Sequence, residues 1–308
     1  MENLILEKPL RGIIPPMVTP LRNNCALDVE ALERLIEHIL RGGVHGLFIL
    51  GTTGEGASLK YDLRRQLISL TCQKVNGRVP VLVGITDCSV TESLQLADAA
   101  SSAGATALVA APPFYFYPDQ MELVRYFLYL ADKVTLPLFL YNIPSLTKVA
   151  IESTSVRMLA QHERIVGLKD SSGDGTYFST TQAMMKSHPS FSLFVGPDEM
   201  LASLVLSGAH GGVSAGANHF PGLYVDLYHA AIAKNFSAAS VLHQKVMEIS
   251  RLIYNPFPVN SGFLKGIKAA LSVMGICDDQ MEFPLNQLDT GQKEIIKKNL
   301  SDLKLMDQ

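Results

Sequence analysis

The stretch Arg164-Ile165-Val166-Gly167-Leu168-Lys169-Asp170-Ser171-Ser172-Gly173-Asp174 contains the pattern that decides the fold. Its first half is a run of aliphatic residues without polar alternation, which is typical of a parallel strand covered on both faces. The run ends in a lysine and passes directly into a polar, glycine-containing turn. We therefore predict a buried strand over 165–169, with Lys169 at its carboxyl end.

The same unit, a short apolar strand, a polar turn and an amphipathic helix, recurs along the chain. Helical patterns such as Val29 to Leu40 and Leu94 to Ala103 follow the strands, and Asp28, Ser89 to Glu92 and Pro118-Asp119 are typical helix starts. Eight units in about 235 residues favour a (β/α)8 TIM barrel over an open sheet, although alternation alone does not determine closure. The predicted strands are 12–19, 46–50, 79–85, 106–111, 136–142, 165–169, 191–196 and 211–216.

The pattern changes after Asn235, where no further strand is predicted. Helical patterns occupy 237–253, 261–274 and 290–304, and Asn255-Pro256-Phe257-Pro258 separates the first from the second. We predict an α/β protein in which residues 1–235 form the barrel and residues 236–308 a C-terminal helical domain.

Composition excludes several classes of protein. With 308 residues, 47% hydrophobic and 18% charged, the chain can bury one large core or two modest ones. A net charge of -3 and scattered Lys and Arg residues predict no nucleic-acid partner. No stretch approaches the roughly 20 apolar residues of a membrane span, and Met1 to Leu10 contains no apolar signal region, so we expect a cytoplasmic protein without a membrane partner.

Cysteine and motif spacing give no sign of a cofactor. Cys25, Cys72, Cys88 and Cys277 are far apart, so we expect reduced, buried thiols. No histidine pair has zinc spacing, and no phosphate-loop or dinucleotide fingerprint is present. We predict neither a metal nor another cofactor.

Chemistry in this fold is expected where strands end, because active sites of (β/α)8 barrels lie at that face. An ammonium group at Lys169 is costly there unless it is paired or neutral, and an uncharged amine adds to a carbonyl to form a Schiff base. The alternative is a lysine that lies just past the strand, in water or paired with Asp170. Residue 169 alone leaves both interpretations open.

Two other strand ends carry groups that suit such chemistry. Gly51-Thr52-Thr53-Gly54 allows backbone amides and two hydroxyls to turn toward a small carboxylate, whereas the alternative is a plain loop. Tyr141 offers a phenol on the strand next to Lys169, where a general acid and base would be needed. Its alternative is a core tyrosine with a bonded hydroxyl.

A different enzyme class and a non-catalytic role also have to be considered. Gly212-Val213-Ser214-Ala215-Gly216 fits the Gly-x-Ser-x-Gly elbow of serine hydrolases. A triad would then need a later acid and histidine at strand ends, but only helical sequence follows, with Asp226, His229 and His243 on predicted helices. A barrel acting as a keto-acid sensor would not require both the amine of Lys169 and the phenol of Tyr141.

Three segments resemble a known family when taken together. Gly51-Thr52-Thr53-Gly54-Glu55, Tyr141-Asn142-Ile143-Pro144 and Gly167-Leu168-Lys169-Asp170, in this order, resemble the pyruvate-dependent class I aldolases and dehydratases of the dihydrodipicolinate synthase and N-acetylneuraminate lyase family. The resemblance covers nearly the whole chain. It implies a (β/α)8 barrel with a C-terminal helical segment, assembled as a homotetramer of two tight dimers.

The resemblance also implies roles for individual residues. Lys169 forms the Schiff base with pyruvate or a longer 2-keto acid, Tyr141 shuttles protons, and Thr52 and Thr53 join the relay and hold the carboxylate. Tyr115 matches a tyrosine that reaches the relay of a neighbouring subunit. The backbone carbonyl of Val213 matches one that approaches the keto acid, and Asp198 and Glu199 match acidic residues that bind polyol hydroxyls.

Departures from the family pattern bear on the substrate. Dihydrodipicolinate synthases usually carry an arginine that grips a second carboxylate where this chain has Leu146, and Lys148 lies two residues further on. N-acetylneuraminate lyases usually carry Ser-Thr near Val213 to Gly216, where this chain does not. We predict a lyase that makes or cleaves a carbon–carbon bond, or dehydrates, through a 2-keto acid imine, and we favour a 2-keto-3-deoxy sugar acid or N-acetylneuraminate-type aldolase. The alternative is a dihydrodipicolinate synthase that condenses pyruvate with aspartate semialdehyde.

Overall fold

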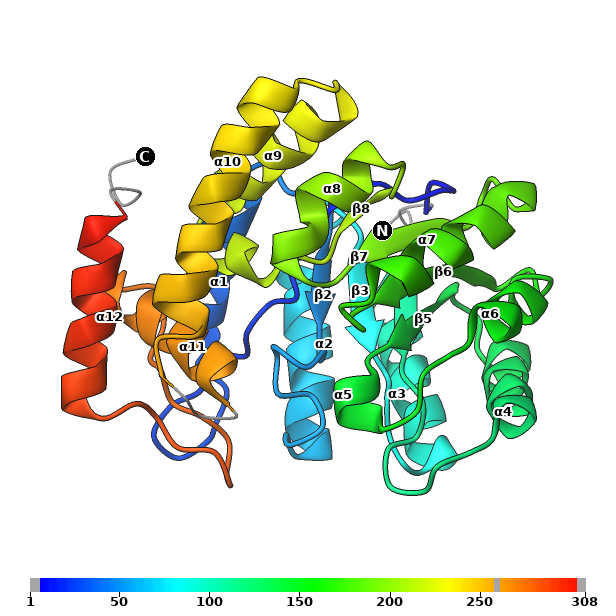
Figure 1. Ribbon diagram of the computed structural model, residues 1–308. Helices are drawn as coiled ribbons and strands as arrows, with labels where there is room; N and C mark the ends of the chain where they lie inside the picture. The colour runs from blue at the N-terminus through cyan, green and yellow to red at the C-terminus, as the bar shows by residue number, and fades with distance from the viewer. Residues whose placement is uncertain (1–5, 258–260, 304–308) are drawn as a thin grey trace.

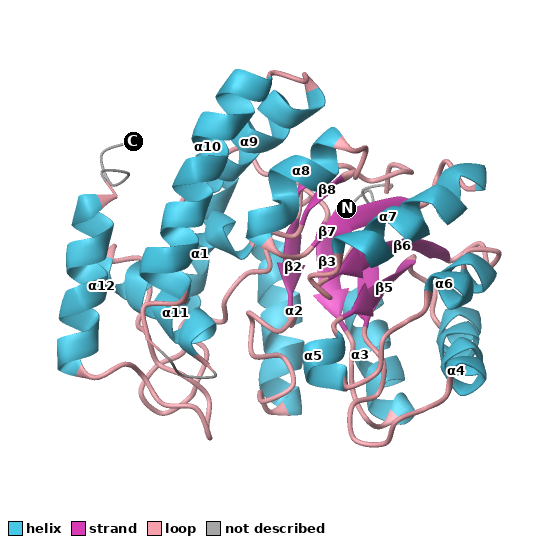
Figure 2. Cartoon of the chain, viewed as in Figure 1, coloured by secondary structure: helices cyan, strands magenta, loops and turns pink. Residues whose placement is uncertain are grey.

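A single parallel sheet of eight strands forms the centre of the molecule, and helices surround it (Figures 1 and 2). The computed structural model describes residues 6–257 and 261–303. The strands are β1 Gly12–Ile13, β2 Leu47–Ile49, β3 Val81–Gly84, β4 Ala107–Ala110, β5 Leu138–Asn142, β6 Ile165–Asp170, β7 Ser192–Val195 and β8 Gly211–Gly212. Each strand pairs with its neighbours in the order β1-β8-β7-β6-β5-β4-β3-β2.

Helices alternate with the strands as far as β8, and only helices follow it in the described residues. The α-helices are α1 Val29–Arg41, α2 Tyr61–Val75, α3 Val90–Ser102, α4 Gln120–Lys133, α5 Pro144–Thr147, α6 Ser153–Leu159, α7 Gly175–Met184, α8 Leu201–Leu206, α9 Pro221–Ile232, α10 Phe236–Ile249, α11 Gly262–Val273 and α12 Thr290–Asp302. Short 3-10 turns lie at η1 Met185–Ser187, η2 Asp198–Met200 and η3 Ala215–Asn218, and a π-helix at η4 Ser250–Tyr254.

Backbone contacts between the two end strands close the sheet into a barrel. Pro16 forms a parallel bridge with Phe48, beyond the end of β1. The Met17 amide donates to the Phe48 carbonyl at 2.8 Å, and the Phe48 amide donates to the Pro15 carbonyl at 2.9 Å. The predicted (β/α)8 barrel is confirmed.

Two predicted strands extend several residues beyond the observed ones. Residues 12–19 were expected to form one strand, but β1 ends at Ile13 because Pro15 and Pro16 have no amide hydrogen for a continuous ladder. Residues 211–216 were also expected to be extended, but β8 ends at Gly212 and the chain enters the 3-10 turn η3 at Ala215. The other six strands lie within one to two residues of their predicted bounds.

The strands bury both faces, as their unbroken apolar runs predicted. Alternate side chains fill the barrel interior, including Phe48, Leu82, Val109, Phe139 and Phe194. The intervening side chains form a second, larger cluster with the apolar faces of the surrounding helices. Lys169 belongs to a strand whose six residues are all buried, and this places its amine inside the protein.

Predicted helix starts are confirmed by their hydrogen bonds. The Asp28 side chain accepts from the Ala31 amide at the start of α1, and Ser89 accepts from the Glu92 amide at the start of α3. Asp119 and Glu122 form a complete capping box at the start of α4. These caps satisfy amide groups that have no partner inside the helix.

The C-terminal helices lie against one side of the barrel, away from α4 and α6 (Figure 1). The predicted helix over 237–253 is α10 followed by the π-helix η4, α11 matches 261–274 closely, and α12 ends at Asp302. Pro258 of the predicted helix break and Lys304 of the last predicted helix lie outside the described residues. The division of the chain at residue 235 stays a prediction.

Two of the four cysteines are buried. The four cysteines are free, and Cys72 and Cys277 are buried as expected. The expectation of buried thiols is wrong for Cys88, which is exposed in the loop before α3, and Cys25 is half-buried. Across 6–257 and 261–303, no helix has the length and apolar character needed to span a membrane.

Candidate active site

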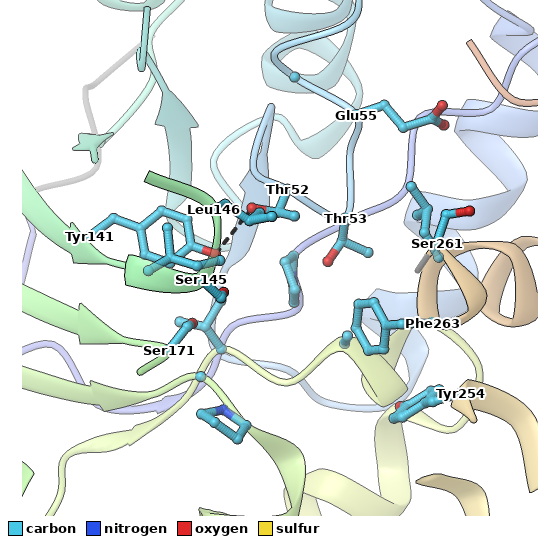
Figure 3. Close-up of a pocket in the computed structure, with 18 of the residues that line it drawn as sticks. Thr52, Thr53, Glu55, Tyr141, Ser145, Leu146, Ser171, Tyr254, Ser261 and Phe263 are labelled. Atoms are coloured by element: carbon cyan, nitrogen blue, oxygen red, sulfur yellow. Dashed lines mark hydrogen bonds between the residues drawn. The ribbon is translucent and has the colours of Figure 1, made fainter. Parts of the chain in front are cut away.

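A cavity of about 630 Å³ opens at the carboxyl ends of the strands (Figure 3). Barrel loops form most of its wall, and the C-terminal segment supplies the rest. Its lining includes Thr52, Thr53, Glu55, Tyr141, Ser145, Leu146, Lys169, Ser171, Asp198, Glu199, Val213, Tyr254, Asn255, Ser261 and Phe263. Lys169 is the one basic side chain among the described residues that line it.

Lys169 projects into this cavity from β6. Its side chain is buried, with 6% of the residue exposed. The Nζ atom lies 4.0 Å from the centre of the Tyr141 ring and 5.2 Å from that of Phe48. The alternative of a solvated lysine at the strand end is therefore wrong, because the strand continues through Asp170 and keeps residue 169 on its inner face.

Asp170 does not provide an ion-pair partner for Lys169. Successive residues of a strand point to opposite faces, so the two side chains diverge. The Asp170 carboxylate accepts hydrogen bonds from Asn142 Nδ2 at 2.8 Å, from the Ser172 amide at 3.1 Å and from Ser172 Oγ at 3.0 Å. Burial raises the pKa of this carboxyl, although these hydrogen bonds act in the opposite direction.

The register of β5 and β6 places Tyr141 directly opposite Lys169. Tyr141 is buried, and its hydroxyl lies 3.2 Å from Thr52 Oγ1, so the two hydroxyls share a hydrogen bond (Figure 3). Thr53 is buried beside them and lines the same cavity. An amine, a phenol and two threonine hydroxyls that are far apart in sequence thus meet at one place.

Asp198 and Glu199 lie in the cavity wall at the end of β7. Asp198 Oδ2 accepts from the Gly216 amide and from the Tyr254 hydroxyl, both at 2.9 Å, and Glu199 accepts from Ser250 Oγ. Oδ1 of Asp198 has no hydrogen-bond partner among the described residues. Burial raises the pKa of Asp198 to about 6, although the two hydrogen bonds act in the opposite direction.

The remaining predicted site residues lie in different environments. Val213 is buried at the end of β8 and lines the cavity. Tyr115, in the loop after β4, is 76% exposed and is not among the residues that line the cavity of its own chain. Ser214 is buried, and its hydroxyl has no partner among the described residues, so no base activates it for the hydrolase alternative.

A smaller apolar cavity of about 260 Å³ adjoins the first one. Thr52, Tyr141 and Leu146 line both cavities. Leu146 lies on α5 and is half-exposed, whereas the Nζ of Lys148 donates to the Ser145 carbonyl at 2.7 Å. Lys148 is not among the described residues that line either cavity.

Sequence reasoning missed the contribution of the C-terminal segment. Tyr254 of η4, Phe263 of α11 and Ser261, which directly precedes α11, enter the cavity wall. Ser145 of α5 and Ser171 of the loop after β6 also line it (Figure 3). The break at Asn255-Pro256-Phe257 was the available signal, because a chain that leaves a helix there can turn back over the barrel mouth. The hydropathy pattern does not predict how close such a loop lies to the carboxyl ends of the strands.

Comparison with known proteins identifies the family. Residues 9–303 match the model of the Dihydrodipicolinate synthetase family. The chain belongs to this family. A 4-hydroxy-tetrahydrodipicolinate synthase of Methanoculleus marisnigri is 34% identical over 294 residues, which are 94% of this chain and 98% of that protein. A second 4-hydroxy-tetrahydrodipicolinate synthase, of Geobacter sulfurreducens, is 33% identical over 286 residues, which are 92% of this chain and 95% of that protein.

Solved structures of the same family superpose along the chain. Dihydrodipicolinate synthase of Bacteroides thetaiotaomicron is 48% identical, with a TM-score of 0.93 over 96% of this chain and 99% of that one. YagE of E. coli K12, a member of the family solved with pyruvate, is 31% identical, with a TM-score of 0.91 and the same coverage. As a member of the dihydrodipicolinate synthetase family, the chain is an enzyme, a Schiff-base-forming lyase of the class I aldolase type.

We also looked for side chains that could hold a metal ion among the described residues. Among them, no three histidine, cysteine, aspartate or glutamate side chains gather closely enough to hold a metal ion. The polar side chains that line the cavity include hydroxyls, carboxylates and the amine of Lys169, which suit covalent and proton-transfer chemistry.

Proposed function

We propose that this lyase cleaves 2-keto-3-deoxy sugar acids, or acids of the N-acetylneuraminate type, into pyruvate and an aldehyde, with Lys169 as the nucleophile. The cavity lining carries the proposal. Beyond Lys169 it offers serine hydroxyls and the acidic pair Asp198 and Glu199, which suit the hydroxyl groups of a sugar acid. It offers no guanidinium for a second carboxylate among the described residues, and Leu146, at the position where the resemblance implies an arginine in dihydrodipicolinate synthases, lines the cavity instead.

In the proposed mechanism the keto acid binds first. Its carboxylate accepts hydrogen bonds from the Thr52 and Thr53 hydroxyls and neighbouring amides, and its C2 carbonyl faces the amine of Lys169. The amine adds to C2 to give a carbinolamine. Tyr141, bonded to Thr52, then protonates the departing hydroxyl so that water leaves and an iminium forms.

Carbon–carbon cleavage uses the same groups. Tyr141 takes the proton of the C4 hydroxyl, the C3–C4 bond breaks, and its electron pair moves into the iminium to give an enamine and an aldehyde. Protonation of the enamine at C3 and addition of water at C2 release pyruvate and restore Lys169. The iminium stabilises the charge that develops at C3, which is why the amine must become covalently attached.

A second candidate function is that of a dihydrodipicolinate synthase, which condenses pyruvate with aspartate semialdehyde. The names of the relatives favour it, since several are 4-hydroxy-tetrahydrodipicolinate synthases at 30–34% identity. Pyruvate in the YagE structure favours pyruvate as the keto acid in either case. The two candidates share Lys169, Tyr141 and the pyruvate imine, and they differ in the aldehyde and in whether the carbon–carbon bond is broken or formed.

We also propose that the protein is a homotetramer built from two tight dimers, in which Tyr115 reaches the relay of a partner subunit. The exposure of Tyr115 and its neighbours Phe116 and Tyr117 supports this proposal, because aromatic side chains of this size are commonly covered in an assembly.

The nucleophile is tested by borohydride reduction in the presence of pyruvate, followed by intact-mass analysis. We expect one stable adduct per chain in the wild type and none in Lys169→Ala. Persistence of the adduct in the variant would show that another amine is the nucleophile.

The substrate is tested by a panel. Pyruvate release from 2-keto-3-deoxy sugar acids and N-acetylneuraminate is compared with condensation of pyruvate onto aspartate semialdehyde at equal enzyme concentration. We expect cleavage of at least one sugar acid to exceed condensation in kcat/KM. Efficient condensation without sugar-acid cleavage would favour the second candidate and contradict our interpretation of Leu146.

A further inference from the structure

A buried ion pair joins residues 51–56, which we call the threonine loop, to the C-terminal segment. Glu55 follows Thr52 and Thr53 in the loop after β2, and Lys268 lies on α11. Lys268 Nζ is 2.5 Å from Glu55 Oε1, with side-chain exposures of 0% and 1%. Lys268 also donates to the Gln280 carbonyl, and Glu55 Oε2 accepts from the Glu282 amide at 2.8 Å. One carboxylate thus holds two parts of the C-terminal segment.

The backbone around Glu55 transmits this anchor to the threonines. Glu55 has a φ of +56°, and its amide donates to the Thr52 carbonyl at 3.0 Å. The Gly54 carbonyl accepts from Thr19 Oγ1 at 2.6 Å, and the Gly56 amide donates to the Gly51 carbonyl at 3.1 Å. The loop is a tight turn, so a displacement of Glu55 displaces Thr52 and Thr53.

Glu55 itself is directed away from the reacting groups. Figure 3 shows its carboxylate turned from Tyr141 toward the side of the cavity formed by the C-terminal segment. It is therefore poorly placed to exchange protons with a keto acid at Lys169. Its contacts instead restrict the loop, because separating the loop from α11 would leave two buried charges without partners.

We infer that Glu55 and Lys268 are positioning residues, through which the C-terminal helical segment holds Thr52 and Thr53 in the geometry that binds the keto-acid carboxylate. The inference rests on the proposed role of the two threonines. It assigns the C-terminal segment a part in substrate binding. Because Lys169 lies on β6 and not on this loop, the chemistry of imine formation stays available when the pair is removed.

The test compares a charge-neutral double variant, Glu55→Gln with Lys268→Met, with the wild type. Removing both charges avoids leaving one of them buried without a partner. The matched control is Glu33→Gln with Lys74→Met, which removes the ion pair of 2.6 Å between α1 and α2, outside the cavity. Borohydride trapping with pyruvate alone gives the pyruvate concentration for half-maximal labelling of Lys169, and thermal unfolding gives Tm.

We expect this concentration to rise about 10-fold or more in the double variant, since a small misplacement of binding groups has effects of that size. The control should stay within about twofold of the wild type. A double variant that is folded and labels like the wild type would overturn the inference, because the ion pair would then have a structural role alone.

A second variant decides the matter if the double variant does not fold. Glu55→Asp keeps the charge but shortens the side chain by one methylene, so it cannot hold Lys268 and the Glu282 amide without moving the loop. We expect several-fold weaker pyruvate labelling, and unchanged labelling in a folded Glu55→Asp would equally overturn the inference. The sugar-acid proposal is independent of this outcome, because the labelling experiment uses pyruvate and no sugar acid. A failure of the sugar-acid proposal would appear in the substrate panel.

Discussion

The pairing of Lys169 with Tyr141 is a consequence of strand register. Parallel neighbours bring residues of β5 and β6 side by side on one face, and here an amine and a phenol occupy matching positions. The Tyr141 ring lies close to the Nζ atom, and its hydroxyl reaches Thr52. Loss of that hydroxyl should remove the proposed proton transfer and leave packing intact.

We expect Tyr141→Phe to lower kcat by about 10²- to 10⁴-fold, the usual contribution of a general acid and base. Steady-state pyruvate release measures it, and circular dichroism reports whether the fold is kept. The matched control is Tyr177→Phe, since the Tyr177 hydroxyl donates to the Ile151 carbonyl at 2.7 Å away from the cavity. Near-normal turnover in Tyr141→Phe would refute its role in proton transfer.

The buried carboxyl of Asp198 should make the free energy of unfolding depend on pH. Its pKa is raised from 3.8 to about 6 by burial. Between these two pH values the folded protein binds more protons than the unfolded chain, so the stability that the neutral carboxyl provides is lost as pH rises through the folded pKa.

The Asp198→Asn variant lacks this titration. Its free energy of unfolding relative to the wild type should therefore increase by about 2 kcal/mol between pH 4 and pH 7, as measured by urea unfolding. Asp62→Asn serves as the control because the Asp62 side chain is fully exposed. A difference between Asp198→Asn and wild type that does not change with pH would contradict the assignment.

At the scale of elements, the end of β2 depends on close approach of the neighbouring backbone. Leu50 follows β2 with a φ of +58°, which turns its carbonyl toward Gly56 and Gly84. A Cβ at Gly84 would lie 2.3 Å from the Leu50 oxygen, and one at Gly56 would lie 2.1 Å from it. The threonine loop can leave the strand at this angle only because both positions are glycine.

We expect Gly84→Ala to destabilise the protein by about 2 kcal/mol or more, because the clash is with backbone that must shift. Gly222→Ala is the control: a Cβ there meets no atom within 4 Å, and the residue lies in α9. That change should stabilise by roughly 0.5–1 kcal/mol. Urea unfolding of both variants measures the difference, and equal effects would refute the packing argument.

At the scale of the whole molecule, the barrel and the C-terminal helices form the cavity together. Tyr254, Ser261 and Phe263 complete a wall that the strand ends leave open (Figure 3). A second feature of this scale is the exposed aromatic group after β4, namely Phe114, Tyr115, Phe116 and Tyr117. In the proposed assembly a partner subunit covers this group.

We expect Phe116→Asp to lower the assembled mass in sedimentation-velocity experiments, because a carboxylate in an apolar contact is strongly unfavourable. Phe283→Asp is the control, since both residues are 81% exposed and Phe283 lies in a separate loop after α11. The control should keep the mass of the wild type. An unchanged mass in Phe116→Asp would show that this group does not form the interface.

The sequence by itself determined the alternation of strands and helices, and three segments taken together indicated the family and its chemistry. Unbroken apolar runs at regular intervals are a local property, so hydropathy locates the strands, and the fold then places Lys169 and Tyr141 at one face. Prediction was weaker at β1 and β8, where prolines and glycines end the ladders before the apolar runs end. Tertiary structure alone decided the Glu55–Lys268 pair and the entry of Tyr254 and Phe263 into the wall. These contacts join segments about 200 residues apart in sequence. A local pattern of hydropathy or turn residues does not predict which distant segments come into contact.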